Sequence, residues 1–154
     1  RLLGKDYKTF VVLGDGECDE GSNWEAALSA VHYKTTNMIS FVDRNKCMID
    51  GRTEDVMRLE PLADKWTAFG FITKVIDGNN IKEICDAIDE ALANETDSPY
   101  MIVLDTIKGC GIDFIEGDFR WHYGAFDDEK YANGKKALEA TYAKRVERAE
   151  KEGK

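Results

Sequence analysis

Residues 9–16 of the chain read TFVVLGDG, and residues 37–42 read NMISFV. Both contain short apolar runs rich in β-branched and aromatic residues, which is typical of buried strands, and the first run ends in a glycine turn. The residues between them carry apolar side chains at helical spacing: Trp24, Ala27, Leu28 and Val31. This spacing predicts an amphipathic helix over residues 20–34, with Ser22 and Glu25 forming a capping box near its start.

The rest of the chain continues this alternation. Strands are predicted over residues 71–76 and 100–106, and helices over residues 61–70, 81–92 and from about Asp128 onward. Strands joined by connections of this length form a parallel sheet flanked by helices on both faces. The length of 154 residues suits one domain, so we predict a single α/β domain over residues 1–154. Its charged C-terminal helix is expected to dock through one apolar stripe: Leu138, Tyr142 and Val146.

Composition excludes several classes of function. The net charge of −9 argues against nucleic acid or an anionic membrane surface as the main partner. No apolar run approaches the roughly 20 residues that a membrane-spanning helix needs. The four cysteines show no CxxC pairing, which argues against a zinc site or a disulfide framework. Reduced thiols predict a cytoplasmic protein.

Three polar clusters follow predicted strands: residues 14–16, residues 43–45 and residues 108–109. Ligands of open parallel sheets bind at the carboxyl ends of strands, so these clusters predict a binding site there. Asp15 and Asn45 would offer hard oxygen ligands, which suit Mg²⁺ or Ca²⁺ held together with a diphosphate. Taken alone, Gly-Asp-Gly is also an ordinary turn.

The segment between residues 14 and 51 resembles a known family. Gly14-Asp15-Gly16, followed about thirty residues later by Asn45, resembles the thiamine-diphosphate signature. The blocks GDGECDEGSNWEAA and DRNKCMIDG are similar to transketolases, in particular to the N-terminal subunits of split transketolases. The likeness extends from about residue 2 to residue 122. It implies a partial thiamine-diphosphate-binding fold, with this chain as the second half of the diphosphate-binding domain.

The resemblance implies a set of site residues. Asp15, Asn45 and the backbone carbonyl of Cys47 would bind Mg²⁺ or Ca²⁺, with the Cys47 thiol as a small apolar side chain. The residues expected to contact the cofactor are Gly14, Asp15, Gly16, Glu17, Asn45, Ile49, Lys108 and His122. Ile49 would pack on the cofactor or, alternatively, in the core. Lys108 would face the diphosphate.

His122 matches the histidine of the family's WHG motif, so the resemblance implies a catalytic position near the cofactor and the incoming sugar. This chain departs from the WHGxxP pattern, because it has Tyr123 directly after the histidine and Phe126 in place of the proline. The resemblance also implies that Glu20 and Glu25 are acidic residues at an interface between paired active sites. Both carboxylates would equally suit the start of a helix, where the helix dipole favours negative charge.

The implied activity is a transferase reaction of the pentose phosphate pathway, in which two-carbon ketol units pass between sugar phosphates. The implied partners are a pyrimidine-binding C-terminal transketolase domain or subunit, together with further copies in a homo-oligomer. An upstream histidine-bearing segment and the pyrimidine-binding domain do not occur in these 154 residues, so we expect no activity from the chain alone. Two alternatives remain. One is another thiamine-diphosphate enzyme, such as deoxyxylulose-phosphate synthase or a 2-oxo-acid dehydrogenase subunit, and the other is a non-catalytic assembly module.

Overall fold

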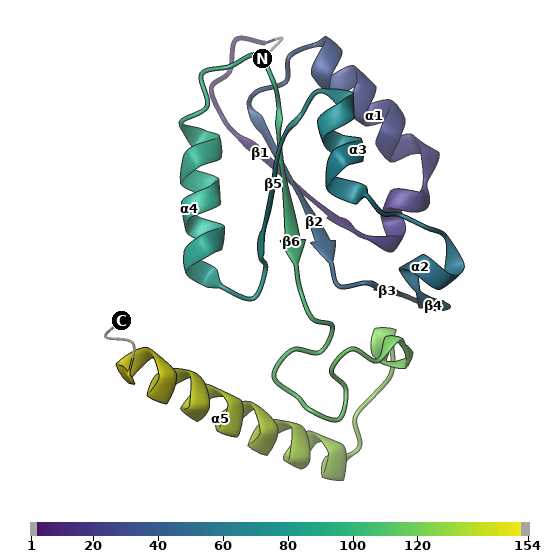
Figure 1. Ribbon diagram of the computed structural model, residues 1–154, viewed down its shortest axis with the longest axis vertical. Coiled ribbons are helices and arrows are strands. Elements are labelled where there is room, and N and C mark those ends of the chain that lie inside the picture. The colour runs from purple at the N-terminus through teal and green to yellow at the C-terminus, as the bar shows by residue number, and fades with distance from the viewer. Residues whose placement is uncertain (1–2, 152–154) are drawn as a thin grey trace.

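In the computed structural model, which describes residues 3–151, four parallel strands form one sheet (Figure 1). The strands are β1 (Thr9–Gly14), β2 (Met38–Arg44), β5 (Ile72–Asp77) and β6 (Tyr100–Asp105). Their order across the sheet is β1-β2-β6-β5, and each neighbouring pair is parallel. The predicted parallel α/β sheet is therefore confirmed.

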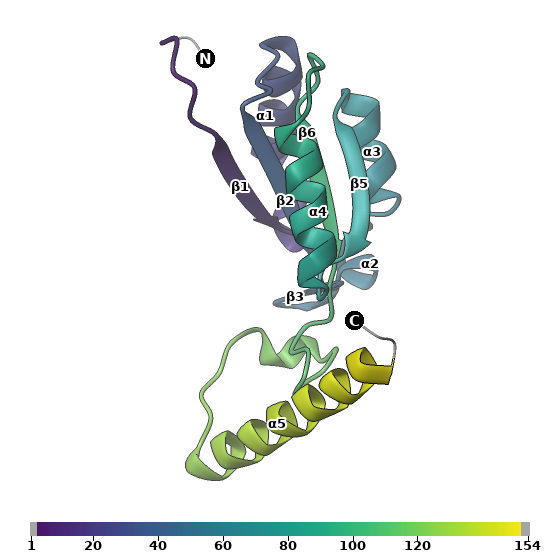
Figure 2. The ribbon, with the colours of Figure 1, turned by 90° about the vertical axis from the view of Figure 1, so that its left-hand side faces the viewer.

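Helices cover the two faces of the sheet. Helices α1 (Gly21–His32) and α3 (Leu62–Phe69) lie on one face, and α4 (Ile81–Leu92) lies on the other (Figures 1 and 2). Between the two helices, the indole of Trp24 on α1 stacks on Trp66 and Phe69 of α3 at centroid distances of 4.7 and 5.3 Å. The core beneath α4 joins two helical alanines to β2 and β6: Ile39, Phe41, Ala87, Ala91, Tyr100 and Ile102.

The start of α1 differs from the predicted capping box. The helix begins at Gly21, so Ser22 lies inside the first turn and the N-cap residue is Glu20, whose side chain makes no capping hydrogen bond. Leu28, predicted on the buried stripe, is 61% exposed. In contrast, α3 follows the prediction, because Pro61 precedes it and Gly70 ends it in the left-handed conformation at φ +105°.

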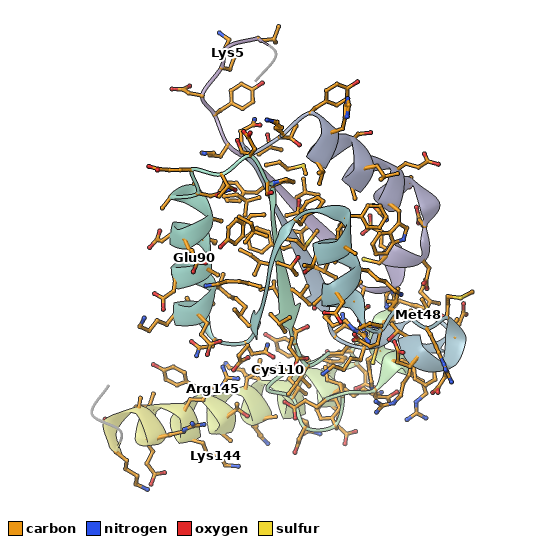
Figure 3. All side chains as sticks on the ribbon, turned by 45° about the horizontal axis from the view of Figure 1, so that its top comes forward. Lys5, Met48, Glu90, Cys110, Lys144 and Arg145 are labelled. Atoms are coloured by element: carbon orange, nitrogen blue, oxygen red, sulfur yellow. The ribbon has the colours of Figure 1, made fainter. Side chains whose placement is uncertain are left out.

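The C-terminal helix α5 (Asp128–Lys151) begins where it was predicted but lies apart from the sheet, beyond the carboxyl ends of the strands (Figures 1 and 2). It contacts the loop after β6 instead, where the Thr141 hydroxyl donates a hydrogen bond to the Gly111 carbonyl (3.2 Å). Figure 3 shows Arg145 of α5 beside Cys110 of that loop, with Nη2 of Arg145 3.4 Å from the sulfur. Of the predicted docking stripe, Leu138 lies against this loop, because a Cβ atom at Gly111 would be 3.0 Å from its Cδ2, whereas Tyr142 and Val146 are 71% and 37% exposed.

Five short elements were not predicted, because each is too short to show periodicity. They are η1 (Gly16–Asp19), β3 (Cys47–Met48), β4 (Gly51–Arg52), α2 (Thr53–Val56) and η2 (Phe119–His122). Figure 1 shows β3, β4 and α2 just past the carboxyl end of β2. In the part of the chain that the structure describes, no helix is long and apolar enough to span a membrane.

Candidate functional site

The polar clusters predicted at strand ends meet at one edge of the sheet. Gly14 lies opposite Asp43 in the register of β1 and β2, and Arg44 lies opposite Asp105 in the register of β2 and β6. The turn after β1 is tied to β2, because the Asp15 N–H donates to the Asp43 carbonyl (3.1 Å). The carboxyl ends of three strands therefore form one continuous polar edge.

Asp15 is the most enclosed acid of this edge, with 1% of its surface exposed. Its Oδ1 accepts a hydrogen bond from the Gly16 N–H (2.8 Å). Its Oδ2 accepts one from the Lys46 N–H (2.5 Å) and one from Nη1 of Arg44 (3.0 Å). A buried carboxylate costs free energy unless it is paired and hydrogen-bonded, and here both conditions hold. The side chain is consequently fixed in one orientation.

Asn45 and Cys47 flank the turn that leads from β2 into the β3–β4 hairpin. Lys46 between them adopts the left-handed conformation at φ +67°. Asn45 Oδ1 accepts a hydrogen bond from the Cys47 N–H (3.1 Å), which orients the amide. The Cys47 sulfur is buried and lies 3.8 Å from the Gly117 carbonyl oxygen. Burial raises the pKa of this thiol, which disfavours the thiolate that a metal would require.

The backbone of the Gly14–Glu17 turn is held by side-chain carboxylates. Glu17 Oε2 accepts a hydrogen bond from the Gly14 N–H (3.0 Å), and this contact is exposed to solvent. A Cβ atom at Gly16 would lie 2.9 Å from the terminal methyl of Met48, so the glycine allows η1 and the hairpin to approach closely. Figure 3 places Met48 among the side chains gathered at this edge.

Cys18, on η1 next to this turn, is no candidate nucleophile. Burial, together with the nearby charges of Asp15, Glu17 and Asp19, raises the pKa of the Cys18 thiol to about 12. The thiol therefore stays protonated at neutral pH. Among residues 3–151, no cluster of three or more His, Cys, Asp or Glu side chains could hold a metal. A metal at this edge would therefore use, beside Asp15, the Asn45 amide oxygen and the Cys47 carbonyl oxygen that the family resemblance implies.

Lys108 and His122 approach each other in the loop between β6 and α5. Nζ of Lys108 lies 3.5 Å from Nδ1 of His122, and the imidazole is exposed. Trp121, beside the histidine, packs edge-on against Phe126 at a centroid distance of 5.3 Å. A cavity of about 420 Å³ opens here, lined by Ile115, Trp121, His122, Tyr123, Gly124 and Phe126. Tyr123 is 74% exposed, so the additional tyrosine does not enter the core.

Three further predicted residues lie on the surface. Ile49 sits in the β3–β4 turn and is 55% exposed, so the alternative that it belongs to the core is wrong. Glu20 and Glu25 are both exposed at the first half of α1. Their carboxylates are accessible to another chain, and neither closes the predicted capping box.

Arg44 was predicted only as part of the polar cluster 43–45 after a strand ending at Val42, and no role was assigned to its side chain. In the structure Arg44 is the last residue of β2, and only 4% of it is exposed. The signal was the alternation along the strand, since Arg44 follows Val42 by two residues and so points to the same face. Val42 is completely buried in the core under α1 and α3.

The chain matches the family described as transketolase, thiamine diphosphate binding domain, over residues 4–149. The chain belongs to this transketolase family. It is 37% identical over 147 residues to one of the apulose-4-phosphate transketolase subunits of Phocaeicola vulgatus, covering 96% of this chain and 50% of that protein. It is 43% identical over 122 residues to the 6-deoxy-6-sulfo-D-fructose transketolase subunit of Clostridium sp. strain MSTE9, covering 79% of this chain and 44% of that protein.

Solved transketolases share the fold. The transketolase of Campylobacter jejuni superposes with a TM-score of 0.78 at 27% identity, covering 86% of this chain and 21% of that one. The resemblance to split transketolases is confirmed, because several relatives are named as single subunits of such enzymes. The chain spans about half the length of the curated relatives it matches.

Proposed function

We propose that this chain is the thiamine-diphosphate- and magnesium-binding part of a transketolase that moves two-carbon ketol units between sugar phosphates. The observation that carries the proposal is the buried Asp15 carboxylate, bonded to the turn that carries Asn45, at the strand ends of a transketolase-family chain. In this proposal the chain is the second half of the diphosphate-binding domain.

The oxygen atoms present suit a divalent cation. A carboxylate has about four lone-pair sites, and three of those on Asp15 accept hydrogen bonds within the chain. The remaining site on Oδ1 is available to a metal. Asn45 Oδ1 accepts one hydrogen bond from Cys47 and has a second lone pair. With the Cys47 carbonyl, these oxygens form the hard ligand set that Mg²⁺ or Ca²⁺ prefers.

Thiamine diphosphate, when bound, supplies a thiazolium carbon that stabilises the charge developing as a carbon–carbon bond is broken or formed. The residues of this chain would bind its diphosphate. Gly14 and Glu17 would contribute backbone N–H groups, and the exposed Glu17–Gly14 contact can be exchanged for a phosphate oxygen. Gly16, whose N–H is bonded to Asp15, would allow the backbone to approach the diphosphate closely. Lys108 would add positive charge, while the exposed Ile49 would contact the apolar part of the cofactor.

His122 is the residue of this chain that we assign to the substrate. Its exposed imidazole, 3.5 Å from Lys108, would bind a sugar oxygen and give or take a proton there. The contact between Cys47 and Gly117 supports this role, because it ties the aromatic loop to the turn that carries the metal ligands.

The proposal includes partners. A pyrimidine-binding transketolase domain or subunit would complete the site, and Glu20 and Glu25 would face another subunit of a homo-oligomer. The names of relatives described as transketolase subunits support a second chain in the enzyme. We assign sugar phosphates as the substrate class but no particular sugar and no place in the pentose phosphate pathway, because the named relatives differ in their sugars. The four free thiols support a cytoplasmic location.

The test is an activity assay on the full-length protein with Mg²⁺, thiamine diphosphate, a ketose phosphate donor and an aldose phosphate acceptor. We expect ketol transfer when a pyrimidine-binding partner is present. Cofactor binding without transfer in the assembled complex would support the assembly module instead. Decarboxylation of a 2-oxo acid without ketol transfer would support one of the other thiamine-diphosphate enzymes.

A further inference from the structure

Arg44 is a buried cation at the centre of the metal-binding edge. Its side chain is 5% exposed and contacts three carboxylates and one hydroxyl. Nη1 donates to Asp15 Oδ2 (3.0 Å) and to Thr53 Oγ1 (2.8 Å). Nε donates to Glu60 Oε1 (2.9 Å), and Nη2 donates to Glu54 Oε1 (3.2 Å). The guanidinium therefore connects β1, α2 and the segment before α3.

These contacts explain how the strand tolerates a buried charge. Removing a guanidinium from water is costly unless it is paired and its donors are satisfied. The carboxylates of Glu54 and Glu60 are 40% and 50% exposed, so they stay in contact with solvent while they offset the charge of Arg44. A lysine could not make the same set of contacts, because its ammonium is a single point and the guanidinium is a planar fork.

The position of Arg44 restricts which oxygen of Asp15 can bind a cation. Arg44 and the Lys46 N–H together occupy Oδ2, whereas Oδ1 accepts only the Gly16 N–H. The carboxylate can therefore offer only Oδ1 to a cation, from a fixed direction. Without the guanidinium, the carboxylate would lose its charged partner and one of the two hydrogen bonds on Oδ2, so that only the Lys46 N–H would occupy this oxygen.

We propose that Arg44 is a positioning residue for the divalent metal: it holds Oδ2 of Asp15 so that Oδ1 alone faces the cation. This inference rests on the proposed function. Partners that orient metal ligands typically change metal affinity by about 10–100-fold when they are mutated. Arg44 itself does not contact the metal in this arrangement.

The test is a Mg²⁺ titration of the full-length protein in saturating thiamine diphosphate, with calorimetry as the readout of Mg²⁺ affinity. We expect Arg44→Lys to weaken Mg²⁺ binding by about 10–100-fold relative to wild type. Glu54→Gln and Glu60→Gln are the matched controls, because each removes the charge of one partner of the same guanidinium and leaves Asp15 unchanged. Both should stay within about threefold of wild type, since partly exposed charges are screened by solvent.

A purely structural role for Arg44 would appear as equal Mg²⁺ affinities in Arg44→Lys and the two controls, with only the unfolding temperature lowered. That result would overturn the inference and leave the proposed function intact. If wild type shows no Mg²⁺-dependent cofactor binding, the proposed function fails and this inference fails with it.

A crystal structure of the wild-type protein with Mg²⁺ and thiamine diphosphate tests the same geometry should Arg44→Lys not fold. We expect the cation on the Asp15 oxygen that faces away from Arg44, with the Arg44–Asp15 hydrogen bonds retained. A cation on the oxygen facing Arg44, or a guanidinium turned away from Asp15, would overturn the inference.

Discussion

Asp15, at the end of a strand, is buried and still has an oxygen atom that could bind a metal. Three hydrogen bonds satisfy most of its carboxylate, and Oδ1 accepts only one of them, from the Gly16 N–H. The charge is balanced by Arg44, whose own position depends on β2. At this scale the proposed metal site depends on one acid and on the cation that orients it.

Substitutions of Lys108 and His122 are expected to affect different quantities, cofactor affinity and kcat, although the two side chains lie close together. Lys108→Gln should weaken thiamine diphosphate binding, because it removes a positive charge from the proposed diphosphate site. His122→Ala should mainly lower kcat in the assembled enzyme, because its proposed contact is with the reacting sugar. Steady-state kinetics and calorimetry on both variants measure this split. Equal losses confined to KM in both variants would show that His122 only binds substrate.

Tyr100 provides a test at alkaline pH. Its hydroxyl donates to Glu90 Oε1 (2.5 Å), and burial together with this contact raises the pKa of Tyr100 to about 12. The phenol is ionised at lower pH in the unfolded chain, where its pKa is about 10. Between these values the unfolded state binds fewer protons, so folding stability falls as pH rises.

We therefore expect wild type to be more stable than Tyr100→Phe at pH 8, by about 1 kcal/mol for the lost hydrogen bond. The difference should shrink as pH rises from 10 toward 12, because the phenylalanine does not titrate. Urea unfolding at several pH values gives the comparison. A difference that grows with pH would contradict the assigned direction of the pKa shift.

Among the elements, the four long strands were predictable from apolar runs, and α1, α3, α4 and α5 from helical spacing, charge or terminal Pro and Gly residues, whereas the short elements around the site were not. The predicted strands end within two residues of those observed. Asp43 and Arg44 are the instructive failure, because the strand was predicted to end at Val42, where the apolar run ends. Pairing with β6 extends β2 to Arg44, since Asp43 and Arg44 lie opposite Leu104 and Asp105.

The sequence predicted the position of the candidate site but not the contacts within it. The pattern of residues placed Asp15 and Asn45 at neighbouring strand ends, which follows from the sheet topology. It did not reveal that Arg44 and Lys46 would both bond to Asp15, because those contacts depend on the turn at Lys46 and on α2. The predicted stripe on α5 was only partly right for a related reason, since an amphipathic pattern does not say which surface a helix will contact.

The left-handed conformation of Gly70 at the end of α3 can be tested by substitution. Its φ of +105° is unfavourable for other residues, and a Cβ there would lie 3.0 Å from Cγ1 of Val31. We expect Gly70→Ala to lower the free energy of unfolding by about 1–2 kcal/mol. Gly21→Ala is the control, because no atom lies within 4 Å of a Cβ at that position. Urea unfolding followed by tryptophan fluorescence compares the two, and equal losses would refute the argument.

At the scale of the molecule, the described residues leave apolar surface uncovered. On β1, Phe10 and Val12 are 52% and 66% exposed, although they lie on the face that α4 covers farther along the sheet. The loop after β6 and α5 form a second layer beyond the strand ends (Figure 2). Exposed strand edges and apolar faces favour association with further protein.

We expect the 154-residue chain by itself to show no ketol transfer above background. Its proposed site holds the cofactor only at the diphosphate end, and much of the rate advantage of an enzyme comes from orienting both reactants. The check is the ketose phosphate and aldose phosphate assay on the isolated chain, with the assembled complex as the positive control. Turnover by the chain alone at the rate of the complex would refute this expectation.

The proposed function requires that Asp15 binds a divalent metal that in turn holds the diphosphate. The direct measurement is calorimetry of thiamine diphosphate binding to the full-length protein, with and without Mg²⁺, for wild type, Asp15→Ala and Asp97→Ala. Asp97 is a surface acid paired with Lys34 and serves as the matched control. We predict Mg²⁺-dependent binding in wild type and Asp97→Ala, and its loss in a folded Asp15→Ala protein. Unchanged Mg²⁺-dependent binding in Asp15→Ala would show that Asp15 is not a metal ligand.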